Sequence, residues 1–312
     1  MTSLFDVDIV ELLAGQVVGR RRELEVLVAA LAADRHVLLE GPPGTGKSTI
    51  LREVASAAGT GFVFVEGNAE LTPARLAGQF DPSRVLEDGY RPEVFVDGPL
   101  VEALRNGSLL YVEELNRVPE ETVNLLITVM SEGELTLPRL GRIEAQPGFR
   151  LVAAMNPFDN IGTARVSGAV YDRMCRIAMG YQSIDEERDI VVRRVSADDR
   201  VLRARAVAVT RGTRTHPDVR VGSSVRGAID LMEVASRLAV LRGQEPTDPE
   251  VGRDAALTAL SGRIRLHEGG SSTPESVITE LWDAVLAREN PEPGDGSEGK
   301  AKAPEGAPKD PR

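Results

Sequence analysis

Residues 41–48 of the chain are Gly41-Pro42-Pro43-Gly44-Thr45-Gly46-Lys47-Ser48, and they match the phosphate-binding loop pattern G-x-x-x-x-G-K-[ST] at every required position. The apolar run just before them, residues 36–40, indicates a buried strand, and residues 48–58 indicate a helix. Glycines let backbone N–H groups approach a polyphosphate, and a helix N-terminus adds partial positive charge. The pattern predicts a nucleotide site; a chance glycine-rich turn is the alternative.

Lys47 is the one lysine of the chain before residue 300, since the other three lie near its end (Lys300, Lys302 and Lys309). We predict that its compact positive charge contacts the β and γ phosphates of ATP, and that the Ser48 hydroxyl is a ligand of Mg²⁺. The residues expected around the nucleotide are Gly41, Pro42, Pro43, Gly44, Thr45, Gly46, Lys47, Ser48 and Thr49.

The length and composition indicate a protein with a full hydrophobic core. With 312 residues, of which 42% are hydrophobic, the chain is long enough for about two domains. No apolar run approaches the roughly 20 residues of a membrane span, and the acidic residues 1–8 do not resemble a signal peptide. We therefore expect a cytoplasmic protein without a membrane span.

Charge and cysteine content narrow the possible partners and the compartment. The net charge of −11 opposes binding to polyanions, so nucleic acid is not expected as a partner. A single cysteine, Cys175, excludes a disulfide framework and fits a reducing compartment. We expect Cys175 to be a small buried residue on a strand rather than a reactive thiol.

Two carboxylates follow the next strongly apolar strand. Residues 109–112 are Leu-Leu-Tyr-Val, and Glu113 and Glu114 come directly after them, at the strand end where ligands of open α/β sheets bind. We predict that Glu113 holds Mg²⁺, directly or through water, and that Glu114 is the general base for an attacking water. Paired glutamates at a strand end are more often only solvated, but their place after a phosphate loop favours the catalytic interpretation.

The remaining pattern divides the chain into three parts. Alternating strand and helix signals up to residue 182 predict an α/β nucleotide-binding domain with a parallel sheet, interrupted by an irregular insertion at residues 69–99 and a hairpin at 133–145. Residues 183–290 have a wholly helical pattern and predict a second, smaller all-α domain. Residues 291–312 contain no large apolar side chain and are expected to be disordered.

With these elements in order, the chain from about residue 10 to about residue 286 resembles an AAA+ ATPase and, more narrowly, the MoxR family. The resemblance rests on four stretches, which are residues 36–47 with the phosphate loop, Gly98-Pro99-Leu100-Val101-Glu102-Ala103-Leu104, Glu113-Glu114-Leu115-Asn116-Arg117 and Ala154-Met155-Asn156-Pro157. It implies a central parallel sheet of strand order 5-1-4-3-2 and a helical lid domain.

The resemblance also implies roles for single residues. Asn156 is similar to the first sensor, which orients the attacking water, and Arg226 is similar to the second sensor, which lies on the lid. Arg173 is similar to an arginine finger that is delivered to the nucleotide of a neighbouring subunit. Arg165 is the second candidate for this finger. The family usually has Asp where this chain has Glu113, so slow hydrolysis or a metal held only through water is an open alternative. Asn68 could hold Glu114 away from water, although a turn asparagine is the other interpretation.

Members of the MoxR family form rings, usually hexamers, in which the two insertions face the central pore. They remodel, mature or activate client proteins in a chaperone-like way, commonly with a partner that carries a von Willebrand factor A domain, and relatives serve Rubisco activation, enzyme maturation and gas vesicle assembly. The resemblance therefore implies an Mg²⁺-dependent ATPase of this type. The alternatives are a nucleotide-gated assembly scaffold with negligible turnover and, disfavoured by the lid, a small-molecule phosphotransferase.

Overall fold

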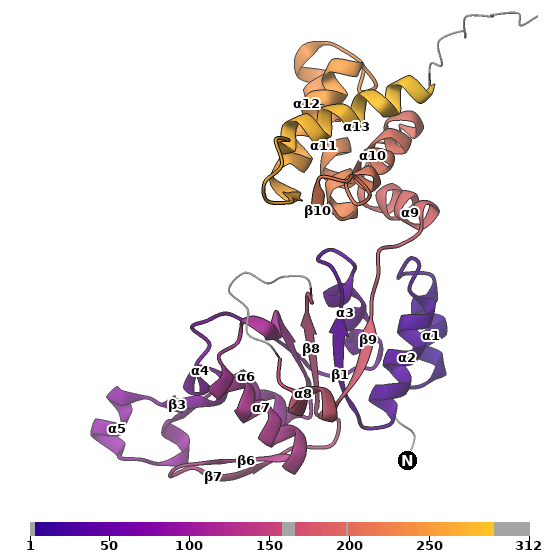
Figure 1. The fold of residues 1–312 in the computed structure, drawn as a ribbon. Helices are drawn as coiled ribbons and strands as arrows, with labels where there is room; N and C mark the ends of the chain where they lie inside the picture. The colour runs from indigo at the N-terminus through magenta and orange to yellow at the C-terminus, as the bar shows by residue number, and fades with distance from the viewer. Residues whose placement is uncertain (1–3, 158–165, 198, 290–312) are drawn as a thin grey trace, which may run out of the picture.

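The computed structural model describes residues 4–157, 166–197 and 199–289. Arg165 and the expected disordered tail, residues 291–312, lie outside the described residues. Figure 1 shows an α/β body around one sheet and a helical part above it, which begins near residue 183. The domain boundary after residue 182 stays a prediction. Within the described ranges, none of the helices combines the length and the apolar content that crossing a bilayer requires.

The body is organised around a five-stranded parallel sheet with the order β2-β5-β8-β1-β9. The strands are β1 (His36–Glu40), β2 (Phe62–Glu66), β5 (Leu109–Glu113), β8 (Arg150–Met155) and β9 (Met174–Ala178). Counted along the chain, this order from β9 to β2 is 5-1-4-3-2. The fold class and strand order predicted from the sequence are therefore confirmed.

The strand register places the candidate site at one edge of the sheet. Glu40 pairs with Met155 and Ala178, and Glu66 pairs with Glu113, so the strands end nearly level. The segments that follow these ends carry the phosphate loop, the two glutamates, Asn156 and the connection to the lid. Parallel strands thus bring together functional residues that are far apart in the sequence.

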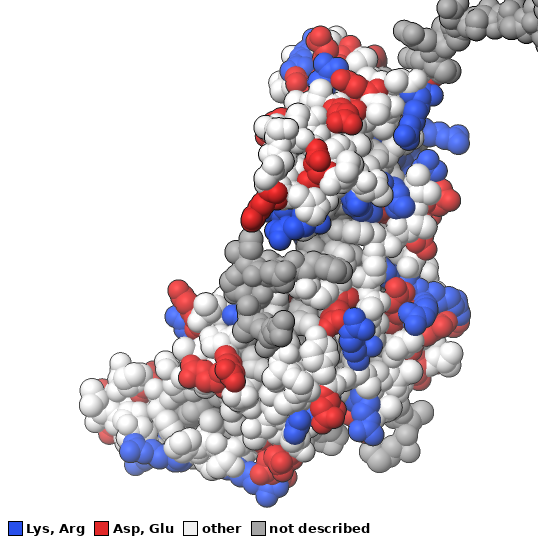
Figure 2. All heavy atoms as spheres, in the orientation of Figure 1, with Lys and Arg blue, Asp and Glu red and all other residues white. Residues whose placement is uncertain are grey.

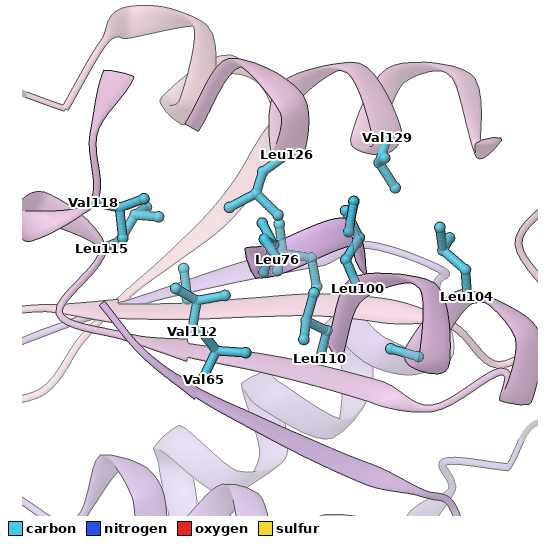
Figure 3. Packing of buried hydrophobic residues seen from close by; sticks show 14 of the residues in the cluster. Val65, Leu76, Leu100, Leu104, Leu110, Val112, Leu115, Val118, Leu126 and Val129 are labelled. Atoms are coloured by element: carbon cyan, nitrogen blue, oxygen red, sulfur yellow. The ribbon is translucent and has the colours of Figure 1, made fainter. Parts of the chain in front are cut away.

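Helices cover both faces of the sheet because successive strand residues point to opposite sides. Val37 and Leu39 pack on the side of α1 (Val7–Ala14), α2 (Arg21–Ala32) and α3 (Lys47–Ala57). Leu38 belongs to the opposite cluster, with α4 (Pro73–Ala77), α6 (Pro99–Asn106) and α7 (Glu120–Glu132). Figure 3 shows this second cluster, where Leu76, Leu100, Leu126 and Val129 from the helices lie over Leu110 and Val112 of β5.

The two predicted insertions project together at one end of the body (Figure 1). The first contains short elements where the sequence showed no simple period: β3 (Gly78–Phe80), α5 (Pro82–Asp88), a 3₁₀ turn η1 (Pro92–Val94) and β4 (Phe95–Asp97), with β3 and β4 antiparallel. The second is the predicted hairpin, β6 (Glu134–Leu137) and β7 (Gly141–Glu144). Arg139 of the hairpin lies 3.6 Å from the centre of the Tyr90 ring, so the insertions contact each other.

The helical part is confirmed as a lid with its own core around the fully buried Trp282. Its helices are α9 (Ile184–Arg194), α10 (Arg200–Gly212), α11 (Val225–Arg242), α12 (Pro249–Leu260) and α13 (Pro274–Glu289), with a 3₁₀ turn η3 (Ser261–Arg263). The expectation that this part is wholly helical is wrong at one point, because β10 (Val219–Val221) pairs with β11 (Arg265–Leu266). Strands of two or three residues are too short to produce an alternating pattern.

The prediction of a buried Cys175 is also wrong, because Cys175 is exposed. It lies on β9, which is an outer strand of the sheet and pairs with β1 on one side only among the described strands. Its neighbour Met174 is buried. A strand at the sheet edge can expose a side chain that the apolar pattern of the sequence would place inside.

Candidate functional site

The phosphate loop joins β1 to α3 and has the backbone that phosphate binding requires. Gly44 and Gly46 have φ values of 73° and 89°, in the left-handed region where glycine is favoured. Gly46 is the N-cap of α3 and no side chain caps the helix, so the first N–H groups of α3 are available to an anion. A Cβ atom on Gly41 would lie 2.1 Å from the Met179 carbonyl oxygen, which explains a glycine at the start of the loop.

Lys47 is buried, and its ammonium group is held by the loop itself. Its Nζ donates hydrogen bonds to the carbonyl oxygens of Gly41 at 2.8 Å and Pro42 at 2.9 Å. Burial lowers the pKa of Lys47 to about 8; Arg226 and Arg20 also lower it, while Glu113 opposes the shift. Phosphate oxygens could replace the two carbonyl groups as acceptors. The ammonium group is therefore preorganised in the loop and close to deprotonation at mildly alkaline pH.

The predicted metal ligands lie next to each other. The Ser48 hydroxyl donates a hydrogen bond of 3.0 Å to Oε1 of Glu113, so the extra methylene of this glutamate does not prevent it from reaching the loop. Both groups are hard oxygen donors, which suit Mg²⁺. Among the described residues there is no group of three or more His, Cys, Asp or Glu side chains that could hold a metal ion. Phosphate oxygens and water would have to supply the remaining ligands.

Tyr111 is a site residue that the sequence analysis did not single out. Its hydroxyl lies 3.2 Å from Ser48 Oγ, and burial raises the Tyr111 pKa far above its usual value. The tyrosine therefore stays neutral beside the predicted metal ligands. In the sequence it was one apolar residue of a buried strand, and no local pattern marks its hydroxyl as part of the site.

Glu114 has an uncommon backbone conformation at the end of β5. Its φ is 54°, which is uncommon for a residue other than glycine, and its Oε2 lies 3.1 Å from Nε of Arg117. The hypothesis that Asn68 holds Glu114 is not supported, because the hydrogen bonds of the Asn68 side chain lie within its own turn, to Glu66 and Glu70. Arg117, not Asn68, is therefore the residue that contacts the Glu114 carboxylate.

Asn156 follows β8, the strand between β1 and β5, and therefore lies between the phosphate loop and the acidic pair. Its carbonyl oxygen accepts a hydrogen bond of 3.5 Å from the Asn116 side chain, in the turn after Glu113 and Glu114. The backbone thus places Asn156 beside the turn that follows the acidic pair, and its role in orienting water stays a prediction.

The lid closes the site from above through the N-terminus of α11. Arg226 lines a cavity of about 440 Å³ together with Gly44, Thr45 and Gly46 of the phosphate loop. A Cβ atom on Gly44 would lie 2.3 Å from the Ser224 hydroxyl, so lid and loop are in close contact. The other lining residues come from the segment before α2 (Gln16, Val17, Val18 and Arg20), from α3 (Thr49), from the connection to the lid (Gln182) and from the lid itself (Ile190, Arg193, Arg194, Val225 and Ile229).

Arg20 is a second site residue that the sequence analysis did not single out. Its guanidinium donates hydrogen bonds to the carbonyl oxygens of Thr45 at 3.0 Å and Gly180 at 2.6 Å, and to Glu23 at 3.0 Å. It is almost fully buried. Arg20 thus ties the phosphate loop to the connection between the sheet and the lid, a link between distant residues that no local pattern predicts.

Arg173 does not join the other predicted residues. It lies on α8 (Gly168–Arg173), where Nε donates to Ser131 Oγ of α7 at 2.5 Å and Nη1 donates to the Ala169 carbonyl oxygen at 3.1 Å. It is not among the residues that line the cavity. The chain therefore brings Lys47, Ser48, Glu113 and Arg226 together and leaves Arg173 outside.

Comparisons with known proteins agree with this arrangement. Residues 36–174 match the family described as AAA domain (dynein-related subfamily), and residues 211–281 match the AAA lid domain. The uncharacterized protein YeaC of Bacillus subtilis is 30% identical over 302 residues, which cover 86% of this chain and 90% of YeaC. The gas vesicle ATPase GvpN1 of Halobacterium salinarum is 32% identical over 275 residues, covering 82% of this chain and 76% of GvpN1.

Solved structures agree at the level of the fold. The RuvB Holliday junction branch migration motor of Thermotoga maritima superposes with a TM-score of 0.51 at 18% identity, covering 78% of this chain and 70% of RuvB. At this identity the likeness supports the shared architecture of parallel sheet and helical lid.

Proposed function

We propose that this chain, which belongs to the AAA ATPase family with an AAA domain and an AAA lid domain, hydrolyses ATP with Mg²⁺ to remodel, mature or activate a client protein complex. The observation that carries the proposal is the contact of 3.0 Å between the Ser48 hydroxyl and Glu113, because it joins the phosphate loop to the acidic strand end at the place where a metal would bind. Lys47 and Arg226 add positive charge for the phosphates from the loop and the lid.

The chain's own residues supply most of the hydrolytic steps. Lys47 and the N–H groups at the start of α3 bind the phosphates, and Arg226 contacts them from the lid. Glu114 takes the proton from the attacking water, which Asn156 orients. When bound, Mg²⁺ would neutralise charge on the β and γ phosphates between Ser48 and Glu113. In this proposal turnover also needs an arginine finger, which does not line the cavity of its own chain.

That finger is Arg173 of a neighbouring subunit in a ring, which we take to be a hexamer. The exposed place of Arg173 on α8, outside the cavity, supports delivery to another copy. Mixing Arg173→Ala, which has an intact phosphate loop, with Lys47→Ala, which has an intact finger, should therefore restore hydrolysis at mixed interfaces. If the mixture stays inactive, the shared site is excluded.

The client-directed activity is the finer part of the proposal. It rests on the likeness to the MoxR type and on a relative that is a gas vesicle ATPase. We propose a chaperone-like remodeller whose two contacting insertions engage the client, with a partner that carries a von Willebrand factor A domain. Pull-down of such a partner by the Glu114→Gln variant with ATP, but not without it, would support this part.

Phosphate release at several protein concentrations tests the ATPase itself. Specific activity should rise with concentration as rings form, and Lys47→Ala should show neither ATP binding nor release. ATP binding and assembly without measurable release would instead favour the alternative, a nucleotide-gated assembly scaffold.

A further inference from the structure

A buried carboxylate lies directly before the phosphate loop. Glu40 is the last residue of β1 and its exposed fraction is 4%. Its Oε1 accepts a hydrogen bond of 2.7 Å from the Tyr171 hydroxyl, and its Oε2 accepts one from Nε of Arg176. A carboxylate at this depth needs such partners, because an unpaired buried charge is strongly destabilising. None of the roles described above accounts for this cluster.

The backbone around Glu40 is fixed on both sides. The Met179 N–H donates to the Glu40 carbonyl oxygen at 2.7 Å, and the Gly41 N–H donates to the Met155 carbonyl oxygen at 3.2 Å. These bonds tie the start of the phosphate loop to β9 and β8. The backbone of Glu40 is therefore fixed at the start of the phosphate loop, and we call its carboxylate, which Tyr171 and Arg176 hold, the anchor.

Tyr171 connects this anchor to the helix of the arginine finger. It lies on α8, two residues before Arg173. This helix has only six residues, and Val170 is its one buried side chain. Arg173 itself is bonded to Ser131 and to its own helix. The Tyr171 hydroxyl thus joins α8 to the end of β1.

We propose that Glu40 and Tyr171 are positioning residues, which hold α8 so that Arg173 is presented to the nucleotide of the neighbouring subunit. The inference rests on the proposed function, since it concerns the shared site. It adds a physical link from the phosphate loop of one subunit to the finger that this subunit offers to the next.

The hydrogen bond from the Tyr171 hydroxyl to Glu40 should persist across the neutral pH range. Burial, and then the bond to Glu40, raise the pKa of Tyr171 to about 12, so its hydroxyl remains a donor throughout the neutral range. Tyr171 is also partly exposed, with 41% of its surface accessible. The substitution Tyr171→Phe removes only the hydroxyl from a ring near the surface, and we expect it to leave the fold intact.

The test uses the mixture of Lys47→Ala and Arg173→Ala subunits. At each active interface of this mixture, the Lys47→Ala subunit supplies the finger and the Arg173→Ala subunit supplies the nucleotide site. Adding Tyr171→Phe to the Lys47→Ala subunit should lower the restored hydrolysis about tenfold or more, because a misplacement of about 1 Å can cost about 10²-fold in rate. Adding the same change to the Arg173→Ala subunit should have no effect, since that subunit has no finger to position.

A loss of hydrolysis when Tyr171→Phe is in the Lys47→Ala subunit, but not when it is in the Arg173→Ala subunit, separates positioning of the finger from a general structural role. Equal losses in the two mixtures, or no loss in either, would overturn the inference while the shared site stands. If the parent mixture shows no restored hydrolysis, the proposed shared site fails and the inference fails with it. Thermal melting of each double variant checks folding. Glu40→Gln keeps an acceptor for the Tyr171 hydroxyl, so adding it to the Lys47→Ala subunit should retain most of the restored hydrolysis.

Discussion

Two arginines, one expected to act on the nucleotide of its own chain and the other on that of a neighbouring subunit, lie in different surroundings. Arg226, at the start of α11, lines the cavity with Gly44 of the phosphate loop, whereas Arg173, on α8, bonds to Ser131 of α7. Arg226 can therefore reach a nucleotide bound by its own chain, whereas Arg173 cannot reach it from its place on α8. This difference leads us to separate ATP binding, which a single chain should perform, from turnover, which should require a neighbour.

The largest expected effect is on turnover in Arg173→Ala. Removing the finger should lower the rate of hydrolysis by about 10³- to 10⁵-fold, because an arginine finger stabilises charge on the transferring phosphoryl group. ATP affinity should stay unchanged, since Arg173 does not line the cavity. Single-turnover hydrolysis and equilibrium binding measure the two quantities. If Arg173→Ala also lost ATP affinity, Arg173 would contribute to ATP binding as Arg226 is expected to do, and the proposed difference between the two arginines would be wrong.

The next effect concerns the general base. Glu114→Gln should bind ATP normally and lose about 10²- to 10⁴-fold in rate, the typical contribution of general-base catalysis. The variant should accumulate as an ATP-bound ring, visible by size-exclusion chromatography. Glu120→Gln, on the exposed first turn of α7, is the matched control and should keep the wild-type rate. Wild-type hydrolysis in Glu114→Gln would remove Glu114 from this role.

Arg226→Ala tests the other side of the comparison. We expect ATP affinity to fall about 10- to 100-fold, since a hydrogen bond to a charged group contributes about 1.5–3 kcal/mol. Arg237→Ala, an exposed position on the same helix, serves as control and should bind ATP like the unchanged protein. If both variants bind equally well, the lid does not contribute a phosphate contact.

The smallest expected effect is a pH dependence of ATP binding. The Lys47 pKa is about 8 without nucleotide, and phosphates favour its protonated form, so the pKa should rise in the complex. Affinity should therefore be constant below pH 8 and fall by at most about tenfold per pH unit above it. Calorimetry near pH 9 in buffers of different ionisation enthalpy should detect proton uptake on binding. Binding without proton uptake would show that Lys47 is already fully charged.

Much of the site could be predicted from local patterns. The phosphate loop combines glycines, one lysine and a hydroxyl within eight residues, and Glu113 and Glu114 are adjacent at a strand end. The hairpin was recognisable from its turn, and the helical lid from its spacing. Each of these features depends on neighbours in the chain, whose geometry follows from backbone preferences and side-chain periodicity.

Other features needed the folded chain. Arg20 reaches Thr45 and Gly180, which are 25 and 160 residues away, and Glu40 reaches Tyr171 across 131 residues. Cys175 is exposed because its strand lies at the edge of the sheet, which its apolar neighbours do not reveal.

The sequence by itself therefore identified the phosphate loop and the acidic pair and, through the family resemblance, the order of the strands. The tertiary structure alone decided which distant side chains meet, such as Arg20 with Thr45 and Glu40 with Tyr171. The physical reason is that backbone and periodicity signals act over a few residues, whereas buried hydrogen bonds and ion pairs form between any segments that packing brings together.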